Sequence, residues 1–298
     1  MERLTYRGMM TASLTVALAA VVVTSPAHAA ERRNGGKLLL TDGVASAEGA
    51  AGGGLATWAV IAGNETRDGI GGAAHATYIA LPDYDLTSVG AALGVSDRVE
   101  LSYAYQTFDT RAAGAALGLG RGFTFGQHII GAKLRVLGDA VWDQDTLLPQ
   151  IAIGAQYKIA EKGDVIRAVG GRESRSVDFF IAATKVWLPA SMVFNTTLRY
   201  TKANQFGLLG FGGPRQPDRT AQVEASAGRL VTSNLLLGVE YRMKPNNLAF
   251  AREDDAYDLF AAWAVRRNVS ITAAYVDLGD IATVDKQRGL FLSLKGGF

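Results

Sequence analysis

The sequence predicts an all-β chain that closes into a single antiparallel, up-and-down transmembrane β-barrel. Segments of about ten residues alternate between apolar and polar side chains, as in 99–106, 150–158, 235–244 and 290–295. A strand that crosses a bilayer at a tilt needs about that length, with one face toward lipid and the other toward the lumen. The alternation therefore indicates membrane strands.

The connections between these segments favour the same fold. Short connections are expected at 96–97, 188–190, 231–233 and 266–267, and longer ones at 109–122, 159–175, 203–218, 245–256 and 279–286. Outer-membrane barrels carry short periplasmic turns and longer extracellular loops. A soluble β-sandwich would mix connection lengths more freely.

The N-terminus indicates export. Arg3 and Arg7 precede an almost wholly apolar or small stretch, 11–24, and small residues flank a cleavage site near Ala29. This order of a basic, an apolar and a small-residue region is typical of a secretory signal peptide. The apolar stretch is too short for a helical membrane span.

We therefore divide the chain into a signal peptide, 1–29, and a barrel, 30–298, in the outer membrane of a Gram-negative bacterium. The chain contains no cysteine, which excludes disulfides, and its formal net charge is +2 at pH 7. This charge does not favour nucleic acid as a partner. Outer-membrane lipid and lipopolysaccharide are the expected surroundings.

The end of the chain sets the direction of every strand. Phe298 closes an alternating segment that resembles the terminal strand through which the barrel-assembly machinery recognises its clients. Counting back from it gives strands 287–298, 268–278, 256–266, 234–245, 219–230, 191–202, 176–187, 147–158, 123–137, 98–108, 84–95, 73–81, 54–63 and 36–43. The prediction is thus about fourteen strands, or twelve if 36–63 instead plugs or lines the lumen.

Aromatic residues fit this orientation. The outward residue near the external end of five strands is a tyrosine, and three further aromatics lie near the opposite rim. Aromatic side chains are enriched at both membrane interfaces. The expected girdle is Tyr105, Tyr157, Tyr200, Tyr241 and Tyr275 on one side, with Trp187, Trp263 and Phe298 on the other.

Five segments together resemble an uncharacterised family of exported Gram-negative envelope proteins, catalogued as a domain of unknown function. They are 52–63 (GGGLATWAVIAG), 114–125 (GAALGLGRGFTF), 201–213 (TKANQFGLLGFGG), 244–258 (KPNNLAFAREDDAYD) and 273–282 (AAYVDLGDIA). The resemblance covers most of the mature chain. It implies an envelope location and supplies no activity and no functional residues.

The lumen is the candidate functional region. The inward-facing residues selected for a pore or binding site are Lys133, Arg135, Arg199, Glu240, Arg242 and Lys244. They indicate a polar, slightly cationic interior and a porin-like channel or small-solute-binding barrel, with small anionic solutes as candidate ligands. No cofactor, metal or enzymatic activity is expected. The apolar segment 205–213 is expected to constrict the lumen.

Three other functions remain open. A non-conducting structural or adhesive barrel would act through its extracellular loops. An outer-membrane acyl hydrolase would use His128 on the barrel wall, although no serine is placed for it to activate. A soluble periplasmic β-protein would use the alternating strands in an ordinary core. The acidic residues near 252–258 are interpreted as loop ion pairs rather than a calcium site.

Overall fold

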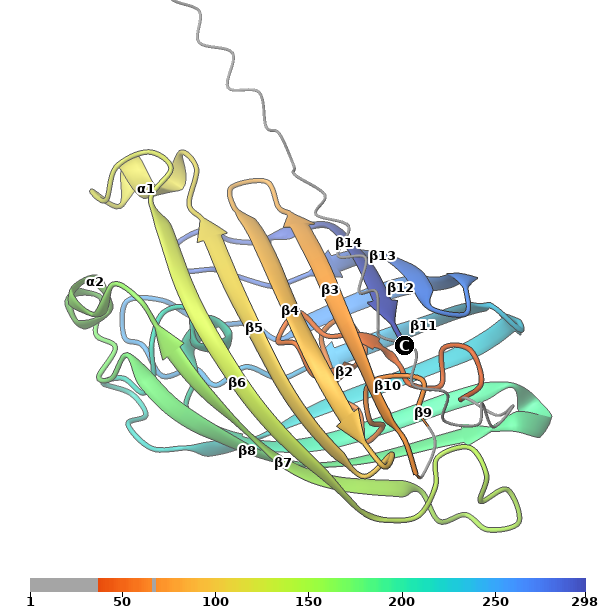
Figure 1. Ribbon diagram of the computed structural model, residues 1–298. Coiled ribbons are helices and arrows are strands. Elements are labelled where there is room, and N and C mark those ends of the chain that lie inside the picture. Colours follow the sequence, from red (N-terminus) through yellow and green to blue (C-terminus); the bar gives the residue numbers. More distant parts are fainter. Residues whose placement is uncertain (1–36, 66–67) are drawn as a thin grey trace, which may run out of the picture. The chain divides into compact units, whose positions relative to one another are not determined.

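A computed structural model describes residues 37–65 and 68–298, and within them twelve antiparallel strands close into a barrel (Figure 1). The predicted all-β barrel is confirmed, with the strand number of the stated alternative. The expected signal peptide, 1–29, and its cleavage site near Ala29 lie outside the described residues. No helix in the described part of the chain is long and apolar enough to cross a membrane.

Each wall strand pairs with its neighbours in sequence, and the last strand pairs with the first. The strands are β3 Ile70–Ala80, β4 Asp85–Val95, β5 Val99–Asp109, β6 Thr124–Leu137, β7 Gln150–Ala160, β8 Arg175–Trp187, β9 Met192–Thr201, β10 Thr220–Thr232, β11 Leu235–Arg242, β12 Ala256–Arg266, β13 Val269–Asp277 and β14 Arg288–Gly297. The closing pair aligns Leu290 with Ala80 and Gly297 with Ala73. Because the sheet is closed, it has no open edge with unpaired backbone groups. A sheet that spans a membrane must be closed in this way.

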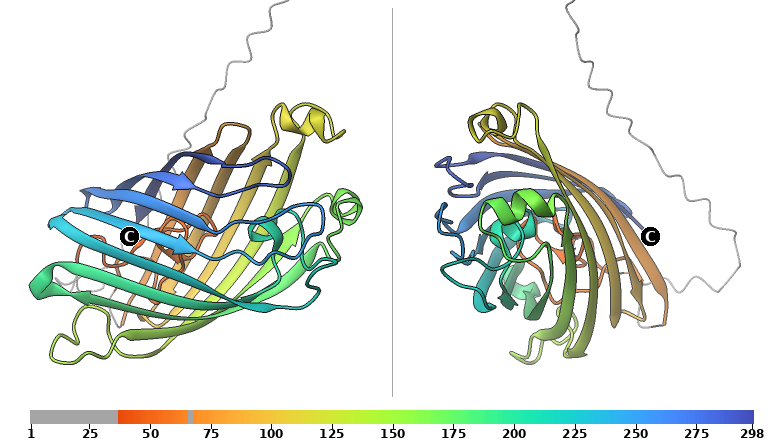
Figure 2. Two further views of the ribbon diagram at one scale, coloured as in Figure 1. Left: turned by 180° about the vertical axis from the view of Figure 1, so that it is seen from behind. Right: turned by 90° about the vertical axis from the view of Figure 1, so that its left-hand side faces the viewer.

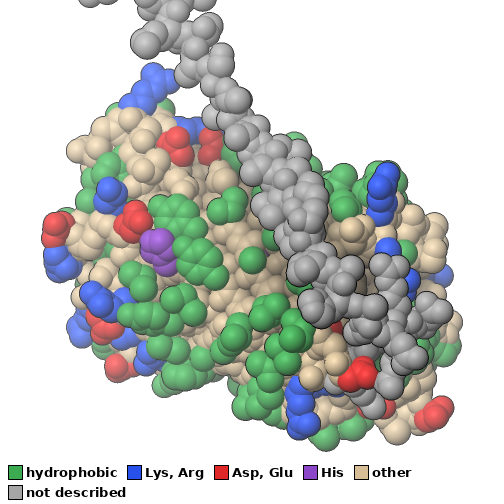
Figure 3. Space-filling model, viewed as in Figure 1, with side chains coloured by type: hydrophobic (Ala, Val, Ile, Leu, Met, Phe, Trp, Pro, Cys, Tyr) green, Lys and Arg blue, Asp and Glu red, His purple; other side chains and the backbone are tan. Residues whose placement is uncertain are grey.

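The outer surface of the wall is apolar. Leu101 on β5, Leu259 on β12 and Leu292 on β14 are each more than half exposed, while the residues next to them in sequence are buried or partly buried. On the face seen in Figure 3, hydrophobic side chains cover much of the wall, and charged ones lie mainly near its edges. This alternation is expected for a wall with lipid on its outer face and polar groups on its inner face.

The two ends of the barrel differ, and we call them the loop end and the turn end. The loop end carries connections 81–84, 110–123, 161–174, 202–219, 243–255 and 278–287, with the helices α1 Ala113–Ala116, α2 Gly163–Ala168 and η2 Asn204–Gly207. The turn end carries 96–98, 138–149, 188–191, 233–234 and 267–268, with η1 Leu188–Ala190. Most connections follow the predicted asymmetry. The exceptions are 81–84, which is short, and 138–149, which is long.

The N-terminal described segment, 37–65, lies inside the barrel, and we call it the plug. Figure 2 shows it within the ring of strands. It contains only the two-residue strands β1 Val44–Ala45 and β2 Ala51–Gly52, which pair with each other. The prediction of fourteen wall strands, with 36–43 and 54–63 among them, is therefore wrong.

The local sequence of the plug explains why 54–63 is not a wall strand. Both faces of the stretch 54–63 are apolar, so it could not present a polar side to the lumen and an apolar side to lipid. Gly49 adopts a φ of 93°, a left-handed backbone that turns the chain back on itself. The direct pairing of β14 with β3 also leaves no gap for further strands.

The close approach of the plug to the wall makes Gly53 sensitive to substitution. A Cβ at Gly53 would lie 1.7 Å from Oε1 of Glu240, whose other carboxylate oxygen accepts the amide of Leu55. We expect Gly53→Ala to displace Glu240 and break that hydrogen bond, at a cost of about 1–3 kcal/mol. Faster amide hydrogen exchange over residues 51–59 would report the loss.

Gly296→Ala is the matched control, because the nearest atom to a Cβ there is the carbonyl oxygen of Asn268 at 4.0 Å. This variant should leave exchange in the plug unchanged. Equal exchange in wild type and Gly53→Ala would contradict the tight docking of the plug.

Candidate functional site: a plugged lumen and an apolar recess

Three glutamates of the wall bind backbone amides of the plug. Glu100 on β5 accepts the amides of Ala51 and Ala62, at 3.2 and 2.9 Å. In addition, Thr57 donates its amide to Glu224 on β10 at 2.8 Å, and Leu55 donates to Glu240 on β11 at 2.7 Å. A buried amide without a partner would be costly, and hydrogen bonds to a charged acceptor are the stronger kind.

Wall side chains also satisfy the carbonyl groups of the plug. Lys133 on β6 donates to the carbonyl oxygens of Ala51 and Trp58, both at 3.1 Å. Arg242 donates to the carbonyl oxygen of Leu55 at 2.9 Å. The other wall donors to plug carbonyls are Ser88, Gln106, Gln150, Asn195, Thr197 and Lys295. The backbone of the plug is therefore hydrogen-bonded without pairing to a wall strand.

One carboxylate of the plug, Glu48, lies among three wall cations. Its Oε1 is 2.5 Å from Nζ of Lys158 and 3.0 Å from Arg242, and its Oε2 is 3.7 Å from Arg199. Burial alone would raise the pKa of Glu48, but the attraction of these three cations outweighs it and holds the pKa well below its ordinary value. Glu48 is thus an anion that the lumen needs for charge balance.

The structure brings most of the predicted lumen residues into contact with the plug or with one another. Lys133, Arg199, Glu240, Arg242 and Lys244 are buried in the lumen. Lys244 donates to the carbonyl oxygen of Leu278 at 2.6 Å, whereas Arg199 pairs with Glu224 and with the hydroxyl of Thr57. The polar atoms of these side chains contact partners inside the barrel.

Arg135 differs from the other five predicted residues. It lies near the turn end, where its guanidinium pairs with Asp97 and Asp139 at 2.9 and 3.2 Å. It is therefore part of the ion pairs at the turn end.

Apolar residues form a row inside the same lumen. Along neighbouring strands, successive residues of the row are register partners, so they face the same side of the sheet. This inner apolar row consists of Phe260, Ala274, Phe291, Ile79, Leu86, Phe108 and Phe125, and all seven side chains are buried. The sequence analysis did not predict this row. Each of its members stands at a position that alternates with the lipid-facing residues of its strand, so an apolar residue there could have indicated the row.

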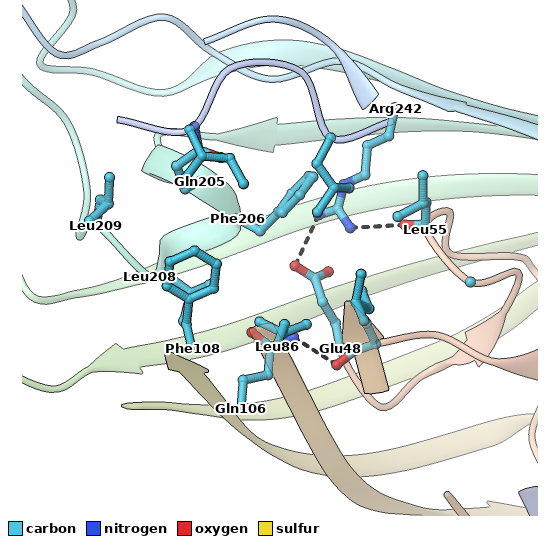
Figure 4. Close-up of a pocket in the computed structure, with 15 residues that line it drawn as sticks. Glu48, Leu55, Leu86, Gln106, Phe108, Gln205, Phe206, Leu208, Leu209 and Arg242 are labelled. Atoms are coloured by element: carbon cyan, nitrogen blue, oxygen red, sulfur yellow. Dashed lines mark hydrogen bonds and ion pairs between the residues drawn. The ribbon is translucent and has the colours of Figure 1, made fainter. Parts of the chain in front are cut away.

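A recess of about 40 Å³ lies between this row, the plug and the connections of the loop end (Figure 4). Ile79, Leu86 and Phe108 of the inner apolar row line one part of it. Connections 202–219 and 278–287 contribute Phe206, Leu208, Leu209, Leu278 and Ile281, and the polar lining residues are Glu48, Gln106, Gln205 and Arg242. The lining is thus mainly apolar.

The connection 202–219 enters the lumen, as the sequence predicts for 205–213. Its residues Gln205 and Phe206 have φ values of 44° and 60°, which cost non-glycine residues about 1–3 kcal/mol each. The conformation is held because Glu253 accepts the amide of Gln205, and Lys158 donates to the carbonyl oxygen of Phe206 at 3.1 Å. The Phe206 ring thereby lies 4.5 Å from the guanidinium of Arg242.

The predicted girdle aromatics lie on the outside of the barrel. Tyr200, Tyr275, Trp187, Trp263 and Phe298 are between 48% and 58% exposed, and Tyr105, Tyr157 and Tyr241 are partly exposed. The tyrosines are near the loop end and the other three near the turn end.

His128 also lies on the outside of the wall. The hydroxyl of Tyr103 is 2.9 Å from its Nδ1, and a carboxylate oxygen of Glu161 is 3.6 Å from its Nε2. The ring of Tyr105 lies 4.8 Å away. His128 therefore contacts Tyr103, Tyr105 and Glu161, and no serine is among these partners.

The comparisons with known proteins identify the family. The chain matches the family described as protein of unknown function (DUF3034) over residues 41–295. The chain belongs to this family. The resemblance predicted from five segments is thereby confirmed, and the DUF3034 match includes most of the plug and nearly all of the wall. No curated protein matches the sequence.

Several solved outer-membrane proteins are similar in structure to this DUF3034 chain. The NanC porin is 10% identical, with a TM-score of 0.47, over 76% of this chain and 98% of its own. The COG4313 outer membrane channel from Pseudomonas putida F1 is 12% identical, with a TM-score of 0.47, over 79% and 97%. Outer membrane phospholipase A from Escherichia coli is 7% identical, with a TM-score of 0.40, over 75% and 89%.

Two carboxyl groups outside the wall strands predict a pH dependence of stability. Burial raises the pKa of Glu253 to about 7 and that of Glu65 to about 7, from an ordinary value of 4.5. Between pH 4.5 and 7 the folded protein therefore binds protons that the unfolded chain has released. Stability contributed by these groups is present below pH 4.5 and falls as the pH rises to 7.

We expect Glu253→Gln to reduce this loss, because an amide keeps an acceptor for the Gln205 amide and does not titrate. Thermal unfolding in detergent between pH 4.5 and 8 measures the effect. Glu173→Gln is the control, since Glu173 is half-exposed and pairs with Lys202 in a loop. An identical pH dependence in wild type and Glu253→Gln would argue against a titrating role for Glu253.

Proposed function

We propose that this protein is a porin-like outer-membrane barrel whose passage for small solutes is closed by the plug. The signal peptide, 1–29, delivers the chain to the envelope, the girdle aromatics lie at the headgroup level, and the loop end faces the outside. Solutes cross only when the plug moves relative to the wall. The barrel has no catalytic role in this proposal.

The occupation of the lumen by the plug is the observation that carries the proposal. Glu100, Glu224 and Glu240 bind its amides, and Glu48 balances three cations, so the plug is attached by hydrogen bonds and ion pairs rather than by strand pairing. Side-chain contacts of this kind exchange with water more readily than a ladder of backbone bonds. The twelve-stranded wall is closed by pairing between its own strands.

The charge of the lumen depends on the plug in the same way. With Glu48 in place, Lys158, Arg199 and Arg242 are paired, and the interior gives no preference for anions. Without Glu48, these three cations face the wall carboxylates Asp178 and Glu224. The predicted cationic lumen therefore belongs to the open barrel in this proposal.

Deletion of residues 37–65 tests the proposal in planar bilayers. Wild type should be closed for most of the recording, and the deleted barrel should give discrete conductance steps with weak anion selectivity. Glu48→Gln should give intermediate behaviour, with more frequent openings, because it removes the countercharge of three cations. Heat-modifiable migration on gels verifies that each barrel is folded.

Glu161→Gln is the control for Glu48→Gln, since Glu161 lies outside the barrel beside His128. It should conduct like wild type. A folded barrel that stays silent after deletion of the plug would refute the proposal and favour the structural or adhesive alternative, in which the extracellular loops act.

A further inference from the structure

Charged side chains of alternating sign surround Glu48 on the inner wall. Five successive strands, from β7 to β11, each place one of them in the half of the lumen nearer the loop end. We call these five buried residues the charge belt: Lys158, Asp178, Arg199, Glu224 and Arg242. Oδ2 of Asp178 is 3.0 Å from the ammonium of Lys158 and 3.8 Å from the guanidinium of Arg199. Oε1 of Glu224 contacts the guanidinium of Arg199 and is 3.4 Å from that of Arg242.

The charge belt carries one positive charge more than it can neutralise by itself. Three cations stand against two carboxylates, and within the described residues every ion pair of the belt is made to another belt member or to Glu48. A buried charge without a countercharge is costly. The belt therefore requires one monovalent anion, and in the closed barrel the plug supplies it.

Glu48 meets this requirement with only one of its two carboxylate oxygens. Its Oε1 is 2.5 Å from the ammonium of Lys158 and 3.0 Å from the guanidinium of Arg242 (Figure 4). Its Oε2 is buried, lies 3.7 Å from Arg199 and has no hydrogen-bond partner in the part of the chain that the structure describes. A free carboxylate is not attached to the plug backbone, so it can turn both oxygens toward the guanidinium groups, whose planar fork matches a carboxylate.

The plug also occupies other donors of the belt that a solute could use. Arg199 donates to the hydroxyl of Thr57 at 2.8 Å, and Arg242 donates to the carbonyl oxygen of Leu55 at 2.9 Å. Both partners belong to the plug, so both guanidinium groups gain free N–H groups when the plug moves away.

Aromatic rings of the wall and of an inserted connection lie beside the same two arginines. The Phe180 ring is 5.2 Å from the guanidinium of Arg199, and the Phe206 ring is 4.5 Å from that of Arg242. Neither ring is part of the plug. They offer apolar contact next to the site that receives the carboxylate, which suits an organic acid better than an inorganic anion.

We propose that the charge belt is a binding site for the carboxylate of a small organic acid, and that Glu48 occupies this site while the barrel is closed. A solute with a single carboxylate balances the belt, whereas a cation or a dianion does not. This inference deepens the proposed function by naming the class of solute, and it rests on that function only for the step of passage.

Glu48→Ala tests the site in the full-length barrel. The substitution removes a methylene and a carboxylate, which together correspond to acetate. In thermal unfolding in detergent at constant ionic strength, acetate should raise the midpoint saturably by roughly 2–4 °C, the shift for a ligand at several times its Kd. Acetamide, which has nearly the same shape and no charge, should have no effect.

Three comparisons assign the effect to the belt. Wild type should not respond to acetate, because Glu48 already occupies the site. Glu161→Ala is the matched control, since it makes the same truncation outside the barrel beside His128. Glu48→Ala combined with Lys158→Met leaves two cations against two carboxylates, so the response to acetate should be lost.

Deletion of residues 37–65 gives a second test that does not depend on the folding of Glu48→Ala. The wall is closed by its own strand pairs, and heat-modifiable migration verifies that it has folded. Acetate should stabilise this barrel as well, and Lys158→Met in it should abolish the effect.

An equal shift with acetamide, or with sodium chloride in place of sodium acetate, would overturn the proposal, as would no shift in either folded variant. The conductance experiment is a separate measurement. If acetate stabilises the barrel without its plug and that barrel stays silent in planar bilayers, the carboxylate site stands and the proposed passage fails. If that barrel conducts and does not respond to acetate, the passage stands and the carboxylate site fails.

Discussion

The hydrogen bonds from wall side chains to the backbone of the plug are the constraint on which the rest of the lumen depends. A segment without regular structure can be buried only if its amides and carbonyls find partners. Glu100, Glu224 and Glu240 accept from it, and Lys133 and Arg242 donate to it. The polar residues of the inner wall thus match the backbone donors and acceptors of the plug, rather than water or ions in general.

This requirement explains why the lumen is polar in one part and apolar in another. Charged residues gather where the plug backbone must be satisfied, and Glu48 in turn neutralises the cations placed there. The inner apolar row lies where the wall faces plug side chains and the inserted connection, so no polar partner is required. The recess occupies the boundary between these two regions, with Arg242 at its polar side.

Sequence alone predicted the wall well, because each strand must satisfy lipid on one side at every second residue, as Leu290, Leu292 and Leu294 do. It did not decide whether 36–63 forms wall strands or plugs the lumen, since the short apolar run at 54–63 is equally consistent with a buried strand and with packed irregular chain. Most of the predicted lumen residues lie inside the barrel. The sequence did not predict which residues they contact there. Glu48 and Glu253 become binding groups only through residues far along the chain, which no local pattern reveals.

The sequence distance between the plug and its partners also orders the assembly of the molecule. Glu48 contacts Lys158 and Arg242, which are 110 and 194 residues further along, and the amide of Asn64 donates to the carbonyl oxygen of Phe298, the last residue. Contacts between such distant residues form only after the intervening chain has been brought together. The plug can therefore complete its contacts only once the chain as far as Arg242, and for Asn64 as far as Phe298, has been brought together.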